Sequence, residues 1–206
     1  MTNTFNRNRI HDLQLSWFTW RNNADTLTMF LVSFIFACFT GLMAQVSLAI
    51  PWSPVLVTFQ TFAVLLAGVF LGSKWGSFSM ILYTILGIIG MPWFTNMSHG
   101  LEFIFQASGG YIIGFIFAAA FTGYVFDNYS STRKPLASFV TMLVANFVFI
   151  YIPGLIGLYY AMLVKVGSPL SFGELIVMGL LPFVVGDLIK IAIASGITTS
   201  VLPKED

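Results

Sequence analysis

The chain has 206 residues, of which 57% are hydrophobic and only 8% are charged, and its formal net charge is +1. A soluble domain carries about 25% charged residues, so this composition excludes a soluble enzyme, a nucleic-acid-binding protein and a disordered chain. A mean hydropathy of +0.88 and roughly 20 apolar residues per membrane span predict a polytopic membrane protein with almost no domain outside the lipid bilayer.

The N-terminal segment is polar and is expected to form a cytoplasmic tail. It carries charged residues at five positions: Arg7, Arg9, Asp12, Arg21 and Asp25. Residues 11–20 fit either a short amphipathic helix in the membrane interface or a frayed tail. The chain thus divides into a tail over residues 1–26, a transmembrane domain over residues 27–202 and a second cytoplasmic tail over residues 203–206.

Apolar runs predict six membrane spans joined by mostly short connections. They are expected at about residues 27–50, 55–71, 76–90, 109–126, 137–152 and 184–202. A polar turn at residues 72–74 separates the second span from the third, and residues 91–106 form a longer connection. Pro153 is expected to kink or stop the fifth span, whose apolar pattern resumes to Val164. Pro182 separates a short helix at residues 171–181 from the last span.

Lysine and arginine residues in the loops set the orientation. With six spans and the N-terminus inside, Lys165 lies outside and Lys190 lies within a span. The remaining seven of the nine basic residues are cytoplasmic: Arg7, Arg9, Arg21, Lys74, Arg133, Lys134 and Lys204. We therefore predict an all-α integral membrane bundle of six transmembrane helices with both termini inside.

Asp187 and Lys190 lie three residues apart on one face of the last span. A lone charge at the centre of a membrane helix costs about 2.5–3.5 kcal/mol. The pair is therefore either an ion pair that fixes helix packing or part of a site that faces a cavity. Cys38 is the only cysteine, so thiolates cannot build a metal site, and we expect neither a metal nor a cofactor.

Further polar residues converge on the outer half of the predicted bundle, where a small pocket would open outward. They are Thr58, Gln60 and Thr61 in the first turns of the second span, Tyr83 in the third and Asn146 in the fifth. Ser108, Gly109, Gly110 and Tyr111 lie at the mouth of the fourth span, where free backbone N–H groups would suit a carboxylate. The connection over residues 91–106 is a candidate lid.

The first span carries small residues on one face, at Ser33, Ala37, Gly41 and Ala44. Such a face lets another helix approach closely. It serves either packing within the bundle or docking of a partner subunit.

Several segments, in order along the chain, resemble the BioY family over about residues 30–202. They are Thr58–Gly68 with Leu71-Gly72; Tyr83, Gly87, Gly90, Pro92 and Phe94; Gly109–Phe115; and the Pro-Phe-x-x-Gly-Asp-x-x-Lys pattern that ends in Asp187 and Lys190. BioY proteins are the biotin-binding S components of energy-coupling factor (ECF) transporters in bacterial cell membranes. The resemblance implies a six-helix S-component fold, biotin as the transported substrate, and three partners: a membrane scaffold subunit and two ATPase subunits.

The resemblance also implies roles for these residues. Asp187 would accept hydrogen bonds from the ureido N–H groups of biotin, and Lys190 would donate to the ureido carbonyl or steady the acid. The amide side chains of Asn146 and Gln60 can both donate and accept hydrogen bonds. Thr58, which lies near Gln60 in the sequence, is a further candidate contact. Tyr83, Tyr111 and Phe94 are candidates for the apolar wall, and the Ser108–Gly110 amides are candidates for binding the valerate carboxylate. The small-residue face of the first span is similar in position to the face that S components turn to the scaffold.

Other functions remain open at this stage. An S component for another vitamin would share the fold and differ in its pocket. An ion-coupled carrier is an alternative, although proton relays generally use chains of Asp, Glu or His, and both histidines lie outside the spans. No metalloprotease motif points to an intramembrane enzyme, and no Gly-x-x-x-x-Gly-Lys-Ser/Thr loop binds ATP, so active uptake would need partners.

Overall fold

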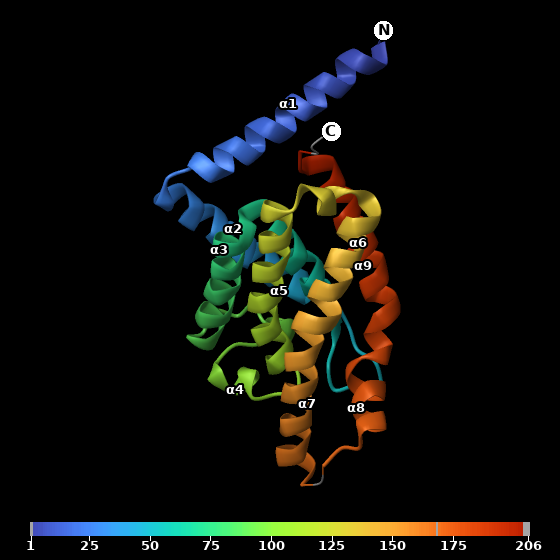
Figure 1. The fold of residues 1–206 in the computed structure, drawn as a ribbon. Coiled ribbons are helices and arrows are strands. Elements are labelled where there is room, and N and C mark those ends of the chain that lie inside the picture. Colours follow the sequence, from blue (N-terminus) through green and yellow to red (C-terminus); the bar gives the residue numbers. More distant parts are fainter. Residues whose placement is uncertain (1, 168, 204–206) are drawn as a thin grey trace.

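The structure, a computed structural model, describes residues 2–167 and 169–203, with side chains from residue 12 onward. Its helices form one bundle, and α1 lies across one end (Figure 1). The elements are α1 (Thr2–Asn23), α2 (Thr26–Gln45), β1 (Ser47–Leu48), β2 (Val57–Thr58), α3 (Gln60–Ile88), η1 (Thr95–Met97), α4 (Leu101–Ile104), α5 (Gly109–Asn128), η2 (Ser130–Arg133), α6 (Pro135–Val144), η3 (Ala145–Ile150), α7 (Tyr151–Val166), α8 (Phe172–Gly179) and α9 (Leu181–Val201).

Some of the residues used to predict orientation cannot be placed. The side chains of Arg7 and Arg9, and the predicted C-terminal tail after Pro203, including Lys204, lie outside the described residues. Arg21 and Arg133, which the sequence predicts on the same side of the membrane, are among the described residues.

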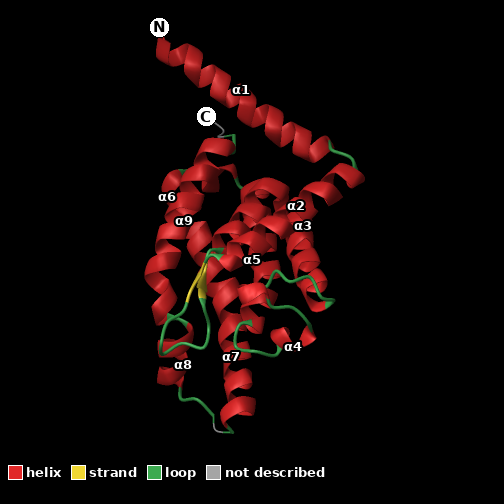
Figure 2. Cartoon of the chain, turned by 180° about the vertical axis from the view of Figure 1, so that it is seen from behind, coloured by secondary structure: helices red, strands yellow, loops and turns green. Residues whose placement is uncertain are grey.

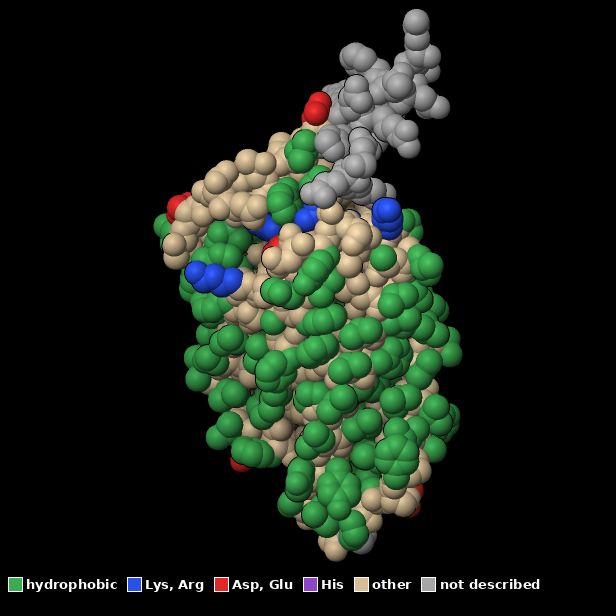
Figure 3. Space-filling view, viewed as in Figure 1, with side chains coloured by type: hydrophobic (Ala, Val, Ile, Leu, Met, Phe, Trp, Pro, Cys, Tyr) green, Lys and Arg blue, Asp and Glu red, His purple; other side chains and the backbone are tan. Residues whose placement is uncertain are grey.

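Five helices among the described residues are long and apolar enough to cross a membrane. They are α2, α3, α5, the continuous helix Pro135–Val166 and α9. Hydrophobic side chains cover the flank of the bundle in Figure 3, whereas Lys and Arg side chains gather at the end where α1 lies. Since a flank of this kind suits lipid rather than water, the chain is a multi-pass membrane protein with the all-helical fold expected from the sequence.

The element α3 consists of two antiparallel arms rather than one straight helix. Gly72 has φ 76° and ψ −178°, which is not helical, and the chain reverses there. Gln60 Nε2 therefore donates to the Tyr83 hydroxyl oxygen at 2.8 Å, although a straight helix would separate these residues by about 35 Å. The predicted turn at residues 72–74 is confirmed, and the arms 60–71 and 73–88 correspond to the predicted second and third spans.

Replacing Gly72 by Ala is expected to lower the unfolding temperature of the detergent-purified protein. A positive φ with ψ near 180° is essentially restricted to glycine, and such strain amounts to about 1–3 kcal/mol. An added Cβ would also lie 2.6 Å from Asp127 Oδ2. Gly173→Ala in α8 is the matched control, because nothing lies within 4 Å of its added Cβ. An unchanged unfolding temperature for Gly72→Ala would contradict the described bend.

The first span is shorter than predicted, because the chain leaves the helix after Gln45 and forms a small ribbon. β1 pairs antiparallel with β2, with Ser47 opposite Thr58, and Figure 2 shows the pair in yellow in the half of the bundle away from α1. Pro51 and Pro54, in the loop between the strands, lack the N–H group that a helix interior requires. Thr58 thus lies in a strand, and α3 begins only at Gln60.

Pro153 does not stop the fifth helix, which runs continuously over Pro135–Val166. Proline cannot donate to the carbonyl four residues earlier, and its ring crowds that carbonyl. Just ahead of Pro153 the helix widens into the π-helical segment η3, where hydrogen bonds span five residues instead of four. The widening accommodates the proline. α7 then continues to the end of the bundle opposite α1, where α8 also lies (Figure 1).

The short helix and the break predicted before the last span are confirmed. α8 starts at a capping box, in which the Ser171 hydroxyl oxygen accepts from the Glu174 N–H at 3.3 Å and the Ser171 N–H donates to the Glu174 carboxylate at 2.8 Å. The Ser171 hydroxyl also donates to this carboxylate at 2.7 Å. These hydrogen bonds hold the pKa of Glu174 below its usual range. Pro182 then stands in the first turn of α9, where its missing N–H leaves no helical hydrogen bond unmade.

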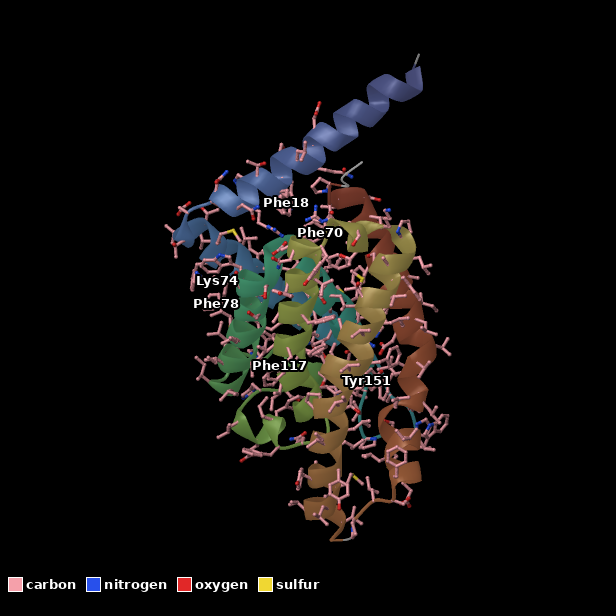
Figure 4. The ribbon with its side chains drawn as sticks, in the orientation of Figure 1. Phe18, Phe70, Lys74, Phe78, Phe117 and Tyr151 are labelled. Atoms are coloured by element: carbon pink, nitrogen blue, oxygen red, sulfur yellow. The ribbon has the colours of Figure 1, made fainter. Side chains whose placement is uncertain are left out.

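The second half of α1 is fixed to the end of the bundle, so the frayed-tail interpretation is wrong there. Arg21 Nη2 lies 2.6 Å from Asp127 Oδ1, and Arg21 Nη1 donates to the Val69 carbonyl at 3.2 Å. The guanidinium groups of Arg21 and Arg133 lie 4.6 and 5.0 Å from the centroid of the Phe18 ring. Phe18 is labelled at this contact in Figure 4. Cation–π pairs and a partly buried ion pair thus join α1 to the bundle.

Candidate ligand-binding pocket

Asp187 is the centre of a buried hydrogen-bond cluster, with a side chain that is 2% exposed. Lys190 Nζ lies 2.5 Å from Asp187 Oδ1. Asp187 Oδ2 accepts from Asn146 Nδ2 at 2.8 Å and from the Tyr151 hydroxyl at 2.5 Å. The Thr61 hydroxyl donates to Oδ1 over a longer distance of 3.4 Å. Each of these partners can donate a hydrogen bond, so four side chains together serve the two carboxylate oxygens of Asp187.

Local helix geometry brings the cluster together. Asp187 and Lys190 share a face of α9 at the predicted three-residue spacing. Asn146 and Tyr151 are five residues apart, which in a regular α-helix would turn them about 140° away from each other. The wider turn of the π segment η3 brings residue i+5 back to the same face, so both side chains reach Asp187. Tyr151 lies on the fifth helix beside α9 (Figure 4).

A cavity opens beside this cluster and extends toward the connection between α3 and α5. The empty space between its walls is about 530 Å³, part of it open to solvent. Its polar end consists of Thr58, Gln60, Thr61, Tyr151, Asp187 and Lys190. Most of its remaining wall is apolar and includes Val55, Phe103, Ile112, Phe115, Ile150 and Phe183. The pocket thus combines one charged end with apolar sides.

The structure brings most of the predicted binding residues to this pocket. Those that line it are Thr58, Gln60, Ser108, Tyr111, Asp187 and Lys190. Tyr83 and Phe94 lie behind the wall: Tyr83 accepts from Gln60 Nε2, and Phe94 stacks on Phe103 with ring centroids 4.8 Å apart. Asn146 donates to Asp187 Oδ2 and likewise does not line the pocket. Each of these three residues contacts a residue of the wall, and its direct contact with a ligand stays a prediction.

Neither Gly109 nor Gly110 is among the described residues that line the pocket, and contact of their amides with a ligand carboxylate stays a prediction. The Gly109 N–H donates to the Gln106 carbonyl at 3.0 Å. A Cβ at Gly110 would clash with the Pro153 carbonyl and meet the Cα of Gly157 at 3.0 Å. Gly110 therefore allows α5 and α7 to touch through their backbones. Of the predicted mouth residues, Ser108 and Tyr111 line the pocket.

The small-residue face of α2 is not available to a partner, so the prediction of a docking face is wrong. Ser33, Ala37, Gly41 and Ala44 are all buried within the chain. The Ser33 hydroxyl donates to the Trp75 carbonyl at 3.3 Å, and a Cβ on Gly41 would lie 2.8 Å from Trp93 Cβ. The alternative interpretation is correct: small residues let α2 pack against the second arm of α3 and the connection that follows it.

Sequence reasoning did not place Tyr151 and most of the apolar wall at the site. Tyr151 carries a hydroxyl in an apolar helix, which is a usable signal, but the α-helical period hides its alignment with Asn146. Phe103, Phe115 and Phe183 carry no such signal. In a chain that is 57% hydrophobic, a phenylalanine that faces a cavity cannot be told from one that faces lipid.

Comparison with known proteins places the chain in the BioY family. Residues 16–205 match the model of the BioY family. The chain is 44% identical over 140 residues to the probable biotin transporter BioY of Methanothermobacter thermautotrophicus, covering 68% of this chain and 89% of that protein. It is 34% identical over 153 residues to the biotin transporter BioY of Thermotoga maritima (72% and 81% covered). It is 31% identical over 180 residues to the probable biotin transporter BioY of Lysinibacillus sphaericus (87% and 88% covered).

Among solved structures, the chain resembles the crystal structure of the S-component for biotin from an ECF-type ABC transporter. The TM-score is 0.73 at 24% sequence identity, covering 86% of this chain and 92% of that one. This likeness establishes an S-component membrane fold. The family match begins at residue 16, inside α1. The resemblance expected from the sequence begins later, at about residue 30.

Proposed function

The chain belongs to the BioY family, and we propose that it is a biotin-specific S component, which captures biotin outside the cell and delivers it through an ECF-type transporter. One observation carries the proposal: a buried carboxylate, surrounded by donors, forms the polar end of a pocket whose other walls are mostly apolar. The names of the relatives, biotin transporters in each case, support the choice of ligand.

The polar end of the pocket matches the ureido ring of biotin, which presents two N–H donors and one carbonyl acceptor. Asp187 is the acceptor for the N–H groups, and its 3.4 Å contact with Thr61 is the weakest of its present bonds and the one a ligand displaces first. Lys190 Nζ donates to the Thr58 carbonyl at 2.8 Å and pairs with Asp187, which leaves one N–H group for the ureido carbonyl. The fused ring then rests against aromatic side chains such as Phe183.

We propose six membrane crossings with both termini in the cytoplasm. The second arm of α3 adds one crossing to the five candidate spans, and an even number fits the placement of α1 and the C-terminus at one end (Figure 1). Arg21 and Arg133 are at that end, where Arg133 Nη1 donates to the Pro203 carbonyl at 2.9 Å. Basic residues favour the cytoplasmic side, so the pocket opens outward from the cell membrane.

The partners proposed for uptake are a membrane scaffold subunit and two ATPase subunits. The sequence has no nucleotide-binding loop of its own, so the energy for concentrating a vitamin must come from other chains. The solved neighbour comes from an ECF-type ABC transporter, which supports this assignment. The scaffold then contacts a surface other than the buried small-residue face of α2.

A titration of the detergent-purified chain with biotin, followed by calorimetry or tryptophan fluorescence, tests the proposal. We expect saturable binding of biotin in a one-to-one ratio and none of thiamine or riboflavin. Binding of another vitamin in place of biotin would keep the S-component fold and overturn the substrate. If a folded, monodisperse sample binds none of them, and the chain alone carries a pH-dependent flux in liposomes, the ion-coupled carrier is the better interpretation.

A further inference from the structure

A second, larger cavity lies at the mouth of the ligand pocket. Its empty space is about 1,530 Å³, including open solvent. It is bounded by the connection Ile104–Ser108 ahead of α5, by Pro54 in the ribbon loop, and by the last turns of α7 from Gly157 to Lys165. We call this cavity the vestibule. Ser108 lines both the vestibule and the pocket, so the two spaces adjoin at this residue.

The charges of the two spaces differ. Lys190 is the one Lys or Arg among the described residues that line the pocket, and it is already engaged by Asp187 and the Thr58 carbonyl. The pocket therefore offers no separate buried cation for a carboxylate. Lys165 is the one charged side chain among the described residues that line the vestibule. It is exposed and lies in the last turn of α7.

This arrangement fixes which end of the ligand reaches the vestibule. A ureido ring held by Asp187 occupies the closed polar end, and the acid chain on its opposite edge extends toward Ser108. The carboxylate then lies at the entrance, where an exposed lysine attracts it only weakly because water screens the charge. Replacing the carboxylate by an amide at the same position therefore costs little binding affinity. The group attached to the amide nitrogen can occupy the open space of the vestibule.

We propose that the vestibule forms a second part of the binding site and accepts biotin amides extended at the carboxyl end, such as N-biotinyl-lysine. The inference rests on the proposed function, since it requires the ureido ring at Asp187. The substrate class of this protein then includes free biotin and biotinyl compounds of the size released when biotinylated proteins are degraded. Lys165 attracts the carboxylate that both kinds of ligand carry.

Competition against labelled biotin on the purified chain tests this proposal. Biotin and N-biotinyl-lysine are expected to displace the label with affinities within about tenfold of each other. A tenfold ratio corresponds to the binding free energy of one weak polar contact. Failure of N-biotinyl-lysine to compete at about 1,000-fold excess over biotin would overturn the inference while leaving the proposed function intact. If biotin itself failed to compete, both this inference and the proposed function would be wrong.

A substitution in the vestibule separates its role from that of the pocket. Ala161 lines the vestibule on α7, so Ala161→Trp should fill it and weaken N-biotinyl-lysine at least about tenfold more than biotin. Ile156→Trp is the matched control, because Ile156 is 53% exposed on the same helix and does not line the vestibule. Equal weakening of both ligands by Ala161→Trp, or the same ratio in Ile156→Trp, would show that the vestibule does not hold the extension.

Discussion

Asp187→Asn is expected to weaken biotin binding by at least about 100-fold, the equivalent of roughly 3 kcal/mol. The asparagine keeps one acceptor and replaces the other carboxylate oxygen with a donor. That donor would face Asn146, Tyr151 or Lys190, which are donors themselves. The ligand N–H groups also lose a charge-assisted acceptor, and such hydrogen bonds are about twice as strong as neutral ones. Calorimetric titration of the variant measures the loss.

Two further variants make this result specific. Asp127→Asn removes a carboxylate that pairs with Arg21 at the opposite end of the bundle, and the affinity of this variant for biotin should equal that of wild type. Tyr151→Phe removes one hydrogen bond to Asp187 and should cost about tenfold in affinity. Biotin affinity within about threefold of wild type in a folded Asp187→Asn variant would remove Asp187 from the binding site.

The sequence predicts the site residues whose side chains differ in polarity from the apolar residues around them. Asp187 and Lys190 stand out because a charge in an apolar helix is expensive, and their spacing already shows that they share a face. The bend at Gly72 was predictable for a similar reason, since a glycine followed by a serine and a lysine interrupts an apolar run. In each case the signal is local in the sequence, so no knowledge of the packing is needed.

The errors occur where the answer depends on what lies opposite a residue. The small residues from Ser33 to Ala44 correctly indicate a close helix contact, but the sequence does not say whether the neighbour belongs to this chain. The same limit applies to Gly110, because the sequence does not show that it packs closely against the backbone of α7. Tyr151 depends on the π segment, which follows from tertiary packing and the proline at position 153 rather than from a periodic pattern.

The sequence left open whether Asp187 and Lys190 form a structural ion pair or a ligand site. Measuring the unfolding temperature and the biotin affinity of the same variants distinguishes the two. Lys190→Met alone leaves a buried carboxylate without its cation, and breaking a buried pair in this way costs about 3–5 kcal/mol. The unfolding temperature of this variant in detergent should therefore fall well below that of wild type. Asp187→Asn alone should also lower it, because Lys190 then lacks its counter-charge.

The double variant Asp187→Asn/Lys190→Met should recover much of the lost unfolding temperature, because replacing both members of a buried ion pair with neutral groups is often close to neutral. The introduced asparagine would still accept a hydrogen bond from Tyr151 or Asn146, and the methionine fills the space of the lysine stem. Biotin binding should stay as weak as in Asp187→Asn. If the pair were only a packing device, a double variant that regains wild-type stability would also regain wild-type affinity. A stable double variant without binding therefore assigns the pair to the ligand.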